Sequence, residues 1–459
     1  MTIPADLTRD DALRGLCDQV ATHVALPGQP GYERCMPWNV AAPVTPAAVV
    51  LATTAEDVAG TVRFAAAHGF TVAVQATGHG AVGVDNDTVL VLTAAMKHVD
   101  VDAVNRTARV GAGARWQDVL EAAAPHGLAP LCGSAPGVGV VGYLTGGGIG
   151  PLVRTFGLSS DHVRAFDVVT GEGRLVRATP TENADLFWGL RGGKATLGIV
   201  TAVEMDLLAV AEFYGGAVCF DGVDAAAVLH AWARWNVALP ETVNTSIAIQ
   251  QLPPLPGVPE PLAGRMTVAV RYAAVGDFAE AERLLAPMRA VATPILDSVG
   301  VLPYTAIGAV HADPVDPMPI HEDQALLTEL PAEAVDALLA LAGPQSGSPQ
   351  VIVELRALGG ALARQPRHRS AFCHRDAAFS LAVIGVPMPD AGAVIEHARA
   401  VTDSVAAWAT GGQMPNFAPS YDSARPARVY DADTLHWLAA LADRYDPARV
   451  LATGQVIRT

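Results

Sequence analysis

Apolar residues in the first half of the chain follow short strand-like runs separated by helical patterns. Four runs predict strands: Val49–Ala52, Phe70–Gln75, Val89–Leu92 and Ala108–Ala112. After the first run, Thr53–Asp57 predicts a helix N-cap, and His68-Gly69 predicts the end of that helix. Trp116–Ala124 predicts a second helix with one apolar face. This half is therefore predicted to combine strands and helices, with glycine-rich loops between them.

The pattern changes after about residue 208. Four runs predict strands: Thr245–Gln250, Met266–Tyr272, Val351–Leu355 and Phe379–Ile384. A capping box at Asp277–Glu280 predicts a helix, and further helices are predicted over Glu329–Leu341 and Asp433–Arg444. Leu252–Gly264 contains five prolines and predicts a loop. Because strands and helices do not alternate strictly, we expect an antiparallel sheet covered by helices on one face, and an α+β fold overall.

Composition narrows the class of protein. The 459 residues are 51% apolar and 17% charged, which excludes a disordered chain and favours two or three domains. The formal net charge is −16, which repels phosphate backbones and anionic lipid. Nucleic acid and membrane surfaces are therefore poor candidates as partners.

Cysteine usage and the N-terminus predict a cytoplasmic location. The five cysteines are scattered and form no CxxC pair, which favours a reduced environment, and no signal peptide is visible. The stretch Ala122–Val153 resembles a membrane span because it lacks Asp, Glu, Lys and Arg. However, nine of its 32 residues are glycine, and a lipid-facing helix would pack poorly with so many. We expect instead a main chain that approaches a ligand closely.

Glycine-rich segments carry the main indication of chemistry. Gly133–Gly150 has the density of glycine that lets successive N–H groups surround anionic oxygens. It does not match the Rossmann nicotinamide pattern of strand, G-x-G-x-x-G and helix, and Gly189–Lys194 is one residue short of a phosphate P-loop. His79 lies on a predicted turn after a strand, where such a histidine usually bonds only to the loop. No metal-ligand spacing is present, and His321-Glu322 and His374-Arg375-Asp376 are predicted to be surface or structural residues.

The order of these segments resembles the berberine bridge enzyme-like FAD-linked oxidases of the vanillyl-alcohol oxidase/p-cresol methylhydroxylase superfamily. The resemblance extends from about residue 44 to residue 456. The matching motifs are Gly78-His79, Val138-Gly139-Val140, Gly146-Gly147-Gly148-Ile149-Gly150, Asp185–Gly193, Gly198-Ile199-Val200-Thr201 and Arg444-Tyr445-Asp446-Pro447.

This resemblance implies a split, two-subdomain FAD-binding domain of the p-cresol methylhydroxylase type over residues 1–208 and 410–459. A substrate-binding domain with a helix-covered antiparallel sheet would occupy 209–409. FAD would lie between two glycine-rich loops, bonded covalently to His79. The implied cofactor-binding residues are Gln75, Ala76, Thr77, Gly78, His79, Gly80, Gly83, Gly133, Ser134, Gly137, Val138, Gly142, Tyr143, Gly146, Gly147, Gly148, Gly150, Gly198, Ile199, Val200 and Asn416.

The chain departs from the family pattern near the flavin. The position of a second flavin-bonding cysteine is Ala135, and Cys132 lies three residues too early, so we expect a single covalent bond. Gln75-Ala76-Thr77 replaces the usual arginine and glycines, which leaves pyrophosphate binding to the main chain. Tyr143 replaces a histidine near the flavin pyrimidine edge. Val138 occupies the position that governs oxygen access in the family, and a small residue there predicts an oxidase.

The catalytic base is not in its usual place. The family often has Asn-Tyr near the C-terminus, whereas Asn416 is followed here by Phe417. Tyr421 and Tyr143 are the candidate bases; a tyrosine needs a neighbouring cation or hydrogen bonds to act at neutral pH, and His374-Arg375 is a candidate source.

The predicted function is oxidation of an alcohol or an activated C–H bond by hydride transfer to flavin N5, with O₂ reduced to H₂O₂. The expected substrates are sugars, glycosides or natural-product intermediates. Two alternatives stay open: a flavin dehydrogenase or oxidative cyclase that uses O₂ poorly, and a non-catalytic binding protein with the flavin fold.

Overall fold

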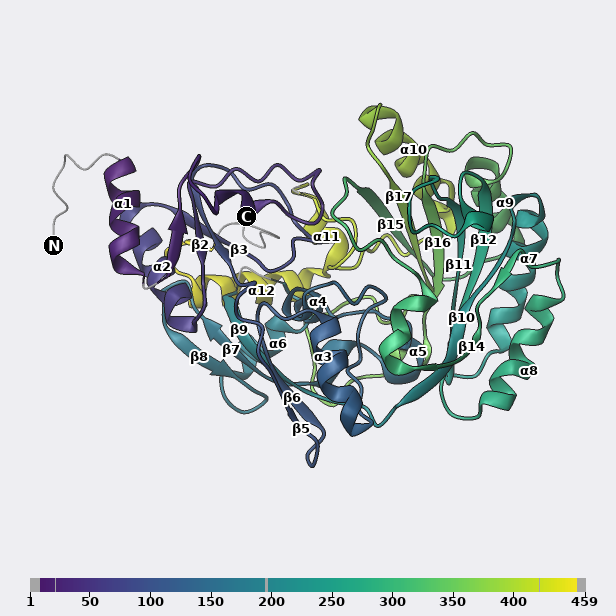
Figure 1. Ribbon diagram of the computed structural model, residues 1–459, viewed down its shortest axis with the longest axis horizontal. Helices are drawn as coiled ribbons and strands as arrows, with labels where there is room; N and C mark the ends of the chain where they lie inside the picture. Colours follow the sequence, from purple (N-terminus) through teal and green to yellow (C-terminus); the bar gives the residue numbers. More distant parts are fainter. Residues whose placement is uncertain (1–8, 21, 195–196, 421, 452–459) are drawn as a thin grey trace.

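Three sheets make up the framework of the molecule (Figure 1). The computed structural model describes residues 9–20, 22–194, 197–420 and 422–451. The sheets have four, five and eight strands, in chain order, and the mixture of helices with largely antiparallel sheets confirms the predicted α+β class. The predicted boundary at 208/209 falls in the connection between the five-stranded and the eight-stranded sheet.

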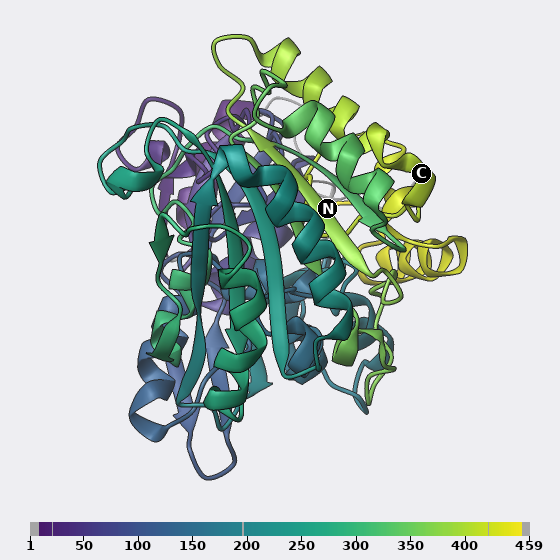
Figure 2. The same ribbon diagram turned by 90° about the vertical axis from the view of Figure 1, so that its right-hand side faces the viewer.

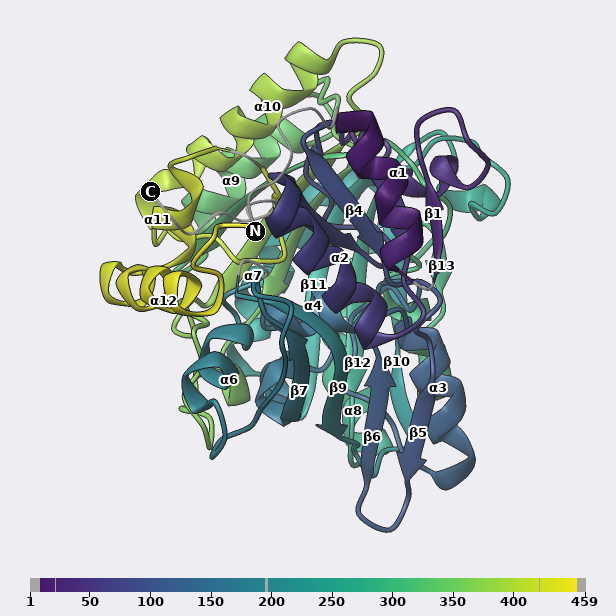
Figure 3. The same ribbon diagram turned by 90° about the vertical axis from the view of Figure 1, so that its left-hand side faces the viewer.

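The four-stranded sheet has the order β1-β2-β4-β3. Its strands are β1 (His23–Ala25), β2 (Ala48–Leu51), β3 (Thr71–Gln75) and β4 (Thr88–Leu92). β2, β4 and β3 are parallel, so their carboxyl ends share one edge. Helix α1 (Arg9–Gln19) contacts helix α2 (Ala55–His68), which contacts β3 and β4 and also β7 of the next sheet (Figure 3). The predicted N-cap is confirmed, because Thr54 and Asp57 form a capping box, and Gly69 ends α2.

The five-stranded sheet has the order β5-β6-β9-β7-β8 and is antiparallel. Its strands are β5 (Val99–Asp102), β6 (Thr107–Gly111), β7 (Val163–Val169), β8 (Leu175–Ala178) and β9 (Ile199–Asp206). Three helices pack on it: α3 (Trp116–Ala123), α4 (Val140–Thr145) and α6 (Ala184–Leu190). Helix α5 (Val153–Phe156) instead contacts strand β11 (Val243–Gln251) of the third sheet. Trp116, Leu144, Phe166 and Leu186 contribute to one buried core between the sheet and these helices.

The charge-free stretch at 122–153 is divided among short helices and loops rather than forming one long helix. Within the described ranges, no helix has both the length and the apolar character needed to cross a bilayer.

The eight-stranded sheet runs β13-β10-β12-β11-β16-β17-β15, with β14 beside β10, and all its pairings are antiparallel. Its strands are β10 (Glu212–Asp221), β11 (Val243–Gln251), β12 (Met266–Ala274), β13 (Leu296–Asp297), β14 (Gly300–Pro303), β15 (His321–Leu327), β16 (Ile352–Ala357) and β17 (Phe379–Gly385). The helices on it are α7 (Ala225–Trp235), α8 (Phe278–Arg289), α9 (Ala332–Ala342) and α10 (Ala391–Ser404). They cover one face, as predicted (Figure 2).

The predicted start of α8 is confirmed without its capping box, and the predicted start of α9 needs correction. The Asp277 carboxylate accepts hydrogen bonds from the N–H groups of Ala279 and Glu280, but Glu280 pairs with Arg283, so the reciprocal half of the predicted capping box is absent. Helix α9 begins at Ala332 rather than Glu329, because Pro331 is the N-cap residue and its ring suits the start of a helix better than its interior.

The end of the chain returns to the first sheets. Helix α11 (Arg425–Val429) is followed by α12 (Ala432–Tyr445), which contacts α6 (Figure 1). Asp446 is fully buried, and its two carboxylate oxygens accept hydrogen bonds from the N–H groups of Val450 and Leu451, both at 2.9 Å. The Val450 carbonyl in turn accepts from the Val72 N–H at 2.8 Å. Asp446 therefore fixes the C-terminal segment against β3.

We expect Asp446→Ala to lower the free energy of unfolding by about 1–3 kcal/mol, because two buried N–H groups lose their acceptor. Chemical denaturation measures this loss. Asp376→Ala, which removes an exposed carboxylate, is the matched control and is expected to have little effect. Equal stabilities of the two variants would contradict the role assigned to Asp446.

Candidate functional site

The turn after β3 presents main-chain donors that the protein itself does not use. The carbonyls of Thr77 and Gly78 accept hydrogen bonds from the N–H groups of Trp38 and Asn39. By contrast, the N–H groups from Thr77 to Gly80 donate to no acceptor among the described residues. Gly78 has φ +76°, and a Cβ there would lie 2.6 Å from Pro37, so only glycine fits. The turn is thus anchored through its carbonyls, with its donors left free.

His79 is held as a neutral imidazole on this turn. Its ring stacks on Trp38 with centroids 4.5 Å apart and an interplanar angle of 11°. Nδ1 lies 2.9 Å from Thr77 Oγ1. Burial lowers the pKa of His79 to about 4; the Arg115 charge acts in the same direction and Asp313 opposes it. A ring nitrogen of His79 therefore keeps its lone pair at neutral pH.

The second glycine-rich loop lies against this turn. The Gly139 N–H donates to Thr77 Oγ1 at 3.3 Å, and Ser134 Oγ bonds to Asp313 Oδ2 at 2.6 Å. A Cβ at Gly137, at Gly142 or at Gly80 of the first turn would meet no atom within 4 Å. These three predicted residues therefore face open space, where a ligand's anionic oxygens can reach main-chain donors.

Other glycines of this loop serve packing rather than a groove. A Cβ at Gly133 or Gly148 would lie 2.8 or 2.5 Å from the Tyr143 ring, and one at Gly150 would lie 2.0 Å from the Cys132 carbonyl. Similarly, a Cβ at Gly147 would lie 2.5 Å from the Phe372 ring. The glycines of this loop therefore fall into two groups. Some face open space, and others lie too close to buried rings or main chain for a side chain to fit.

Tyr143 is the ring around which the loop folds. It packs edge-on against Trp116, with centroids 5.4 Å apart at 85°. Its hydroxyl is buried with no hydrogen-bond partner among the described residues. Burial raises the pKa of Tyr143 well above its ordinary value of 10, so the hydroxyl keeps its proton at neutral pH. This environment disfavours Tyr143 as a base. Tyr421, the other predicted base, lies outside the described residues.

Asn416 and Lys194 join the C-terminal segment to α4. Asn416 Nδ2 donates to the Tyr143 carbonyl at 2.8 Å, and a Cβ at Gly146 would lie 2.0 Å from Asn416 Oδ1. Lys194 Nζ donates to the Gly142 carbonyl at 2.9 Å. Burial, with a contribution from Arg425, lowers the pKa of Lys194 to about 7. In the sequence, Lys194 stood out only as the lysine of an incomplete P-loop.

The remaining predicted cofactor residues lie in strands β3 and β9 or in the loops themselves. Ile199 and Val200 are buried at the start of β9, and Gly198 before them leaves no room for a Cβ beside Val168. Gln75 donates through Nε2 to the Cys35 carbonyl at 3.2 Å. Three further residues are placed by the same loops: Ala76, Gly83 and Val138.

The inner face of the eight-stranded sheet brings buried charges to the glycine-rich loop. Arg271 and His311 contact Glu354 Oε1 at 2.8 and 3.1 Å, and Arg356 contacts Glu354 Oε2 at 3.2 Å. The charges of Arg356 and Arg271, together with the hydrogen bond to His311, hold the pKa of the Glu354 carboxyl well below its usual range against its burial. Arg356 also donates to the carbonyl of Ile149 at 3.4 Å. Glu354 is therefore a permanently ionised, structural carboxylate.

Glu322, on β15 of the same sheet, has the opposite character. Burial raises its pKa to about 7, although the Ala418 N–H and the charges of Arg425 and Arg356 favour the ionised form. A carboxyl group with this pKa exchanges a proton readily at neutral pH. Sequence reasoning missed Glu322, to which it had assigned a surface or structural role. The polar run Glu322-Asp323-Gln324 does not reveal which of these side chains will be buried.

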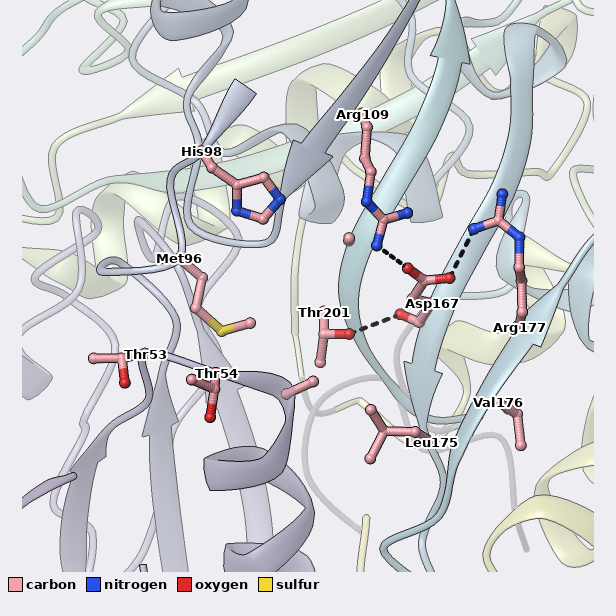
Figure 4. Close-up of a pocket in the computed structure, with 12 residues that line it drawn as sticks. Thr53, Thr54, Met96, His98, Arg109, Asp167, Leu175, Val176, Arg177 and Thr201 are labelled. Atoms are coloured by element: carbon pink, nitrogen blue, oxygen red, sulfur yellow. Dashed lines mark hydrogen bonds and ion pairs between the residues drawn. The ribbon is translucent and has the colours of Figure 1, made fainter. Parts of the chain in front are cut away.

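A separate cavity of about 430 Å³ opens between the N-terminus of α2 and the five-stranded sheet (Figure 4). Thr53, Thr54 and Met96 line one side of it. On the other side Asp167 contacts Arg109 and Arg177, the latter at 2.9 Å. None of the predicted site residues lines this cavity, and its charged groups are paired with one another.

A parallel strand edge followed by a turn with free main-chain donors is an arrangement that can bind the anionic oxygens of a nucleotide cofactor. Residues 46–179 match the family described as "FAD binding domain". The (R)-6-hydroxynicotine oxidase of Paenarthrobacter nicotinovorans is 27% identical over 88% of this chain and 89% of its own length. The FAD-dependent monooxygenase prx3 of Penicillium roqueforti is 32% identical, but over only 44% of this chain and 40% of its own length.

The fold comparison agrees. The structure of a berberine bridge enzyme-like protein, BBE-like 1 of Physcomitrella patens, superposes with a TM-score of 0.83 at 21% identity, covering 97% of this chain and 98% of that one. The chain thus carries a match to an FAD-binding domain, is similar to FAD-linked oxidases, and has the fold of a berberine bridge enzyme-like protein. The turn after β3 fits this cofactor, because its free N–H donors suit a pyrophosphate.

We expect Gly142→Val to fill the groove while leaving the fold intact, because its Cβ meets no protein atom within 4 Å. The purified variant should carry at least about tenfold less flavin per chain than the parent, a ratio that absorbance spectroscopy measures. Gly300→Val, at an equally open position in β14, is the control and should keep its flavin. A Gly142→Val variant with full flavin content would place the cofactor elsewhere.

Proposed function

We propose that this protein is an oxidase that removes hydride from an alcohol or activated C–H group of a small molecule and transfers the electrons to O₂, giving H₂O₂. FAD, attached covalently to His79, supplies the redox chemistry when bound. The observation that carries the proposal is a neutral histidine on a turn whose main-chain donors are free, within a segment that matches an FAD-binding domain. Glu322, with a pKa of about 7, adds a carboxyl group that can exchange a proton. The relative named as a 6-hydroxynicotine oxidase supports an oxidase.

His79 supports the covalent attachment. Attack on a flavin methyl carbon requires an uncharged ring nitrogen held on a rigid turn, and His79 meets both conditions through its lowered pKa and its stacking on Trp38. Ala135 occupies the position of the second attachment found in the family, and Cys132 is buried with a strongly raised thiol pKa of about 12. A buried thiol with this pKa is a poor nucleophile, which supports a single bond through His79.

Glu322 is the proposed base. Hydride removal from an alcohol leaves a hydroxyl proton to be accepted, and a carboxylate with a pKa of about 7 accepts it at neutral pH while retaining useful basicity. The positive charges of Arg425 and Arg356 favour the ionised form of Glu322, and the negative charge of Glu354 opposes it. A polar sheet face around the base suits a substrate with hydroxyl groups, such as a sugar, a glycoside or an oxygenated natural product.

Val138 supports O₂ as the electron acceptor. This residue is half-buried, and its carbonyl accepts the Trp116 N–H at 3.1 Å, which fixes the main chain beside the groove. A small side chain there leaves space for a diatomic molecule. Stopped-flow reoxidation of the reduced protein tests this part of the proposal, since slow reoxidation in air would indicate a dehydrogenase.

The covalent bond is tested by acid precipitation. We expect the yellow colour of the parent protein to stay with the precipitate, and that of His79→Ala to pass into the supernatant, because only the former holds its flavin through a C–N bond. His126→Ala, at an exposed position, is the control and should behave like the parent. Colour released from the parent protein would refute the attachment.

We expect Glu322→Gln to lower kcat/KM by about 10²–10⁴-fold, the usual contribution of a general base. In the parent, kcat/KM should rise with pH through about 7, as Glu322 loses its proton; this rise should vanish in the variant. Asp323→Asn is the control, since Asp323 Oδ2 accepts from Thr402 on helix α10, away from the loops.

The free energy of unfolding of the parent protein should fall as pH rises, whereas its kcat/KM should increase. Because folding raises the pKa of Glu322, the folded state loses stability as pH rises from about 4.5 to about 7, and the cost is largest above pH 7. Glu322→Gln removes that cost, so its melting temperature should exceed that of the parent at pH 8 and match it near pH 4. A variant that keeps full activity would exclude Glu322 as the base.

A further inference from the structure

The chain after helix α10 runs alongside β15, the strand that carries Glu322. The contacts between them follow one another in order: Ala409 with Leu327, Thr410 with Leu326, Met414 with Gln324, and Ala418 with Glu322. The Met414 contact is a hydrogen bond of 2.7 Å from its N–H to Gln324 Oε1. The Ala418 N–H comes next in this order and donates to the Glu322 carboxylate. The path of the main chain therefore brings Ala418 to Glu322.

Arg425, the first residue of α11, holds residues 414–418 through their carbonyl groups. Its side chain is buried; Nε donates to the Ala418 carbonyl at 2.9 Å and Nη2 to the Phe417 carbonyl at 2.6 Å. Nη2 also lies 3.3 and 3.4 Å from the carbonyl oxygens of Met414 and Pro415. A planar guanidinium presents its donors in a fixed fork, so one side chain can set the shape of the whole segment.

Ala418 has a backbone conformation that needs this support. Its φ is +46°, in the left-handed region that residues with a Cβ rarely adopt. Such a conformation persists where the surrounding contacts determine it, and Arg425 holds the Ala418 carbonyl on one side of the residue. The N–H group on the other side is thereby directed at Glu322. Loss of the guanidinium would let Ala418 return to an ordinary conformation and would move its N–H.

The same segment reaches the glycine-rich half of the molecule. Asn416 Nδ2 donates to the Tyr143 carbonyl on α4 at 2.8 Å. Phe417 packs on a buried cluster that contains Ile149 of the glycine-rich loop. The segment therefore joins β15 to α4, and its shape decides how Glu322 lies relative to that loop.

Charges from two further elements act on Glu322. Arg425 of α11 and Arg356 of β16 favour its ionised form, whereas Glu354 of β16 opposes it. Burial opposes the ionised form most strongly. A carboxylate is stabilised both by an opposite charge and by an N–H donor, so removing Arg425 weakens both contributions at once. The protonated form of Glu322 would then persist to a higher pH.

We propose that Arg425 is the positioning residue of Glu322. It shapes residues 414–418 so that the Ala418 N–H donates to the carboxylate, and its charge favours the ionised form. This role rests on the function of Glu322 as base proposed above, and it adds the means by which that base is kept ready to accept a proton. Arg425 itself transfers no proton, because a guanidinium stays charged at neutral pH. It acts through Glu322 and the segment.

Infrared spectroscopy of the purified holoprotein tests this role without a substrate. Spectra over a pH series show the C=O band of a protonated carboxyl group, and the band that is lost in Glu322→Gln belongs to Glu322. In the parent its midpoint should lie near pH 7. We expect Arg425→Met to raise the midpoint by at least about 0.5 pH unit, because the charge and the fixed N–H are both lost. Arg364→Met, which removes an exposed arginine paired with Glu241, is the control and should keep the parent midpoint.

Arg425→Lys separates position from charge. A lysine keeps the positive charge but cannot hold several carbonyls in fixed directions. We expect its midpoint to lie above that of the parent and no higher than that of Arg425→Met. A lysine variant at the parent midpoint would overturn the positioning role, and the lysine variant alone decides if the methionine variant does not fold.

Failure of this role can be told apart from failure of the proposed function. If both Arg425 variants keep the parent midpoint while Glu322→Gln loses kcat/KM, Glu322 is the base and the role of Arg425 is wrong. If the midpoints move as expected while Glu322→Gln keeps full kcat/KM, Glu322 is not the base, although Arg425 still positions it.

Discussion

Main-chain N–H groups that have no acceptor among the described residues are the constraint on which the turn after β3 depends. Such donors are costly when they are buried without a partner, so they persist only where a ligand or water can reach them. The turn after β3 keeps its donors free by committing its carbonyls to Trp38 and Asn39. Gly78 permits that turn because its positive φ and its contact with Pro37 exclude a side chain. The free donors of this turn therefore result from the hydrogen bonds that its carbonyls accept from Trp38 and Asn39.

Contacts between the sheets determine what faces this groove. Trp38 Nε1 donates to the Val315 carbonyl at 3.0 Å, and Ser134 reaches Asp313, so the segment before β15 is tied to both glycine-rich loops. Arg356 reaches Ile149 from β16. These links hold strand β16 and the segment before β15 against Ile149, Ser134 and Trp38.

Two carboxyl groups on that sheet show how burial alone does not decide ionisation. Glu354 is surrounded by Arg271, Arg356 and His311, and their attraction outweighs its desolvation. Glu322 has weaker compensation, so its desolvation prevails and its pKa rises to about 7. The first arrangement stabilises the sheet, and the second supplies a group that can exchange a proton. The raised pKa of Glu322 lowers the free energy of unfolding at neutral pH and above.

The sequence by itself determined the local elements and the cofactor loops. Alternating apolar runs and the Thr54 cap predicted β2, α2 and β3, because these depend on neighbouring residues, and the Gly78-His79 turn follows from them. Only the tertiary structure separated Gly142, which faces open space, from Gly148, which packs on Tyr143. It also decided the environment of Glu322. That environment depends on segments distant in the sequence, and no local pattern records how deeply a side chain will be buried.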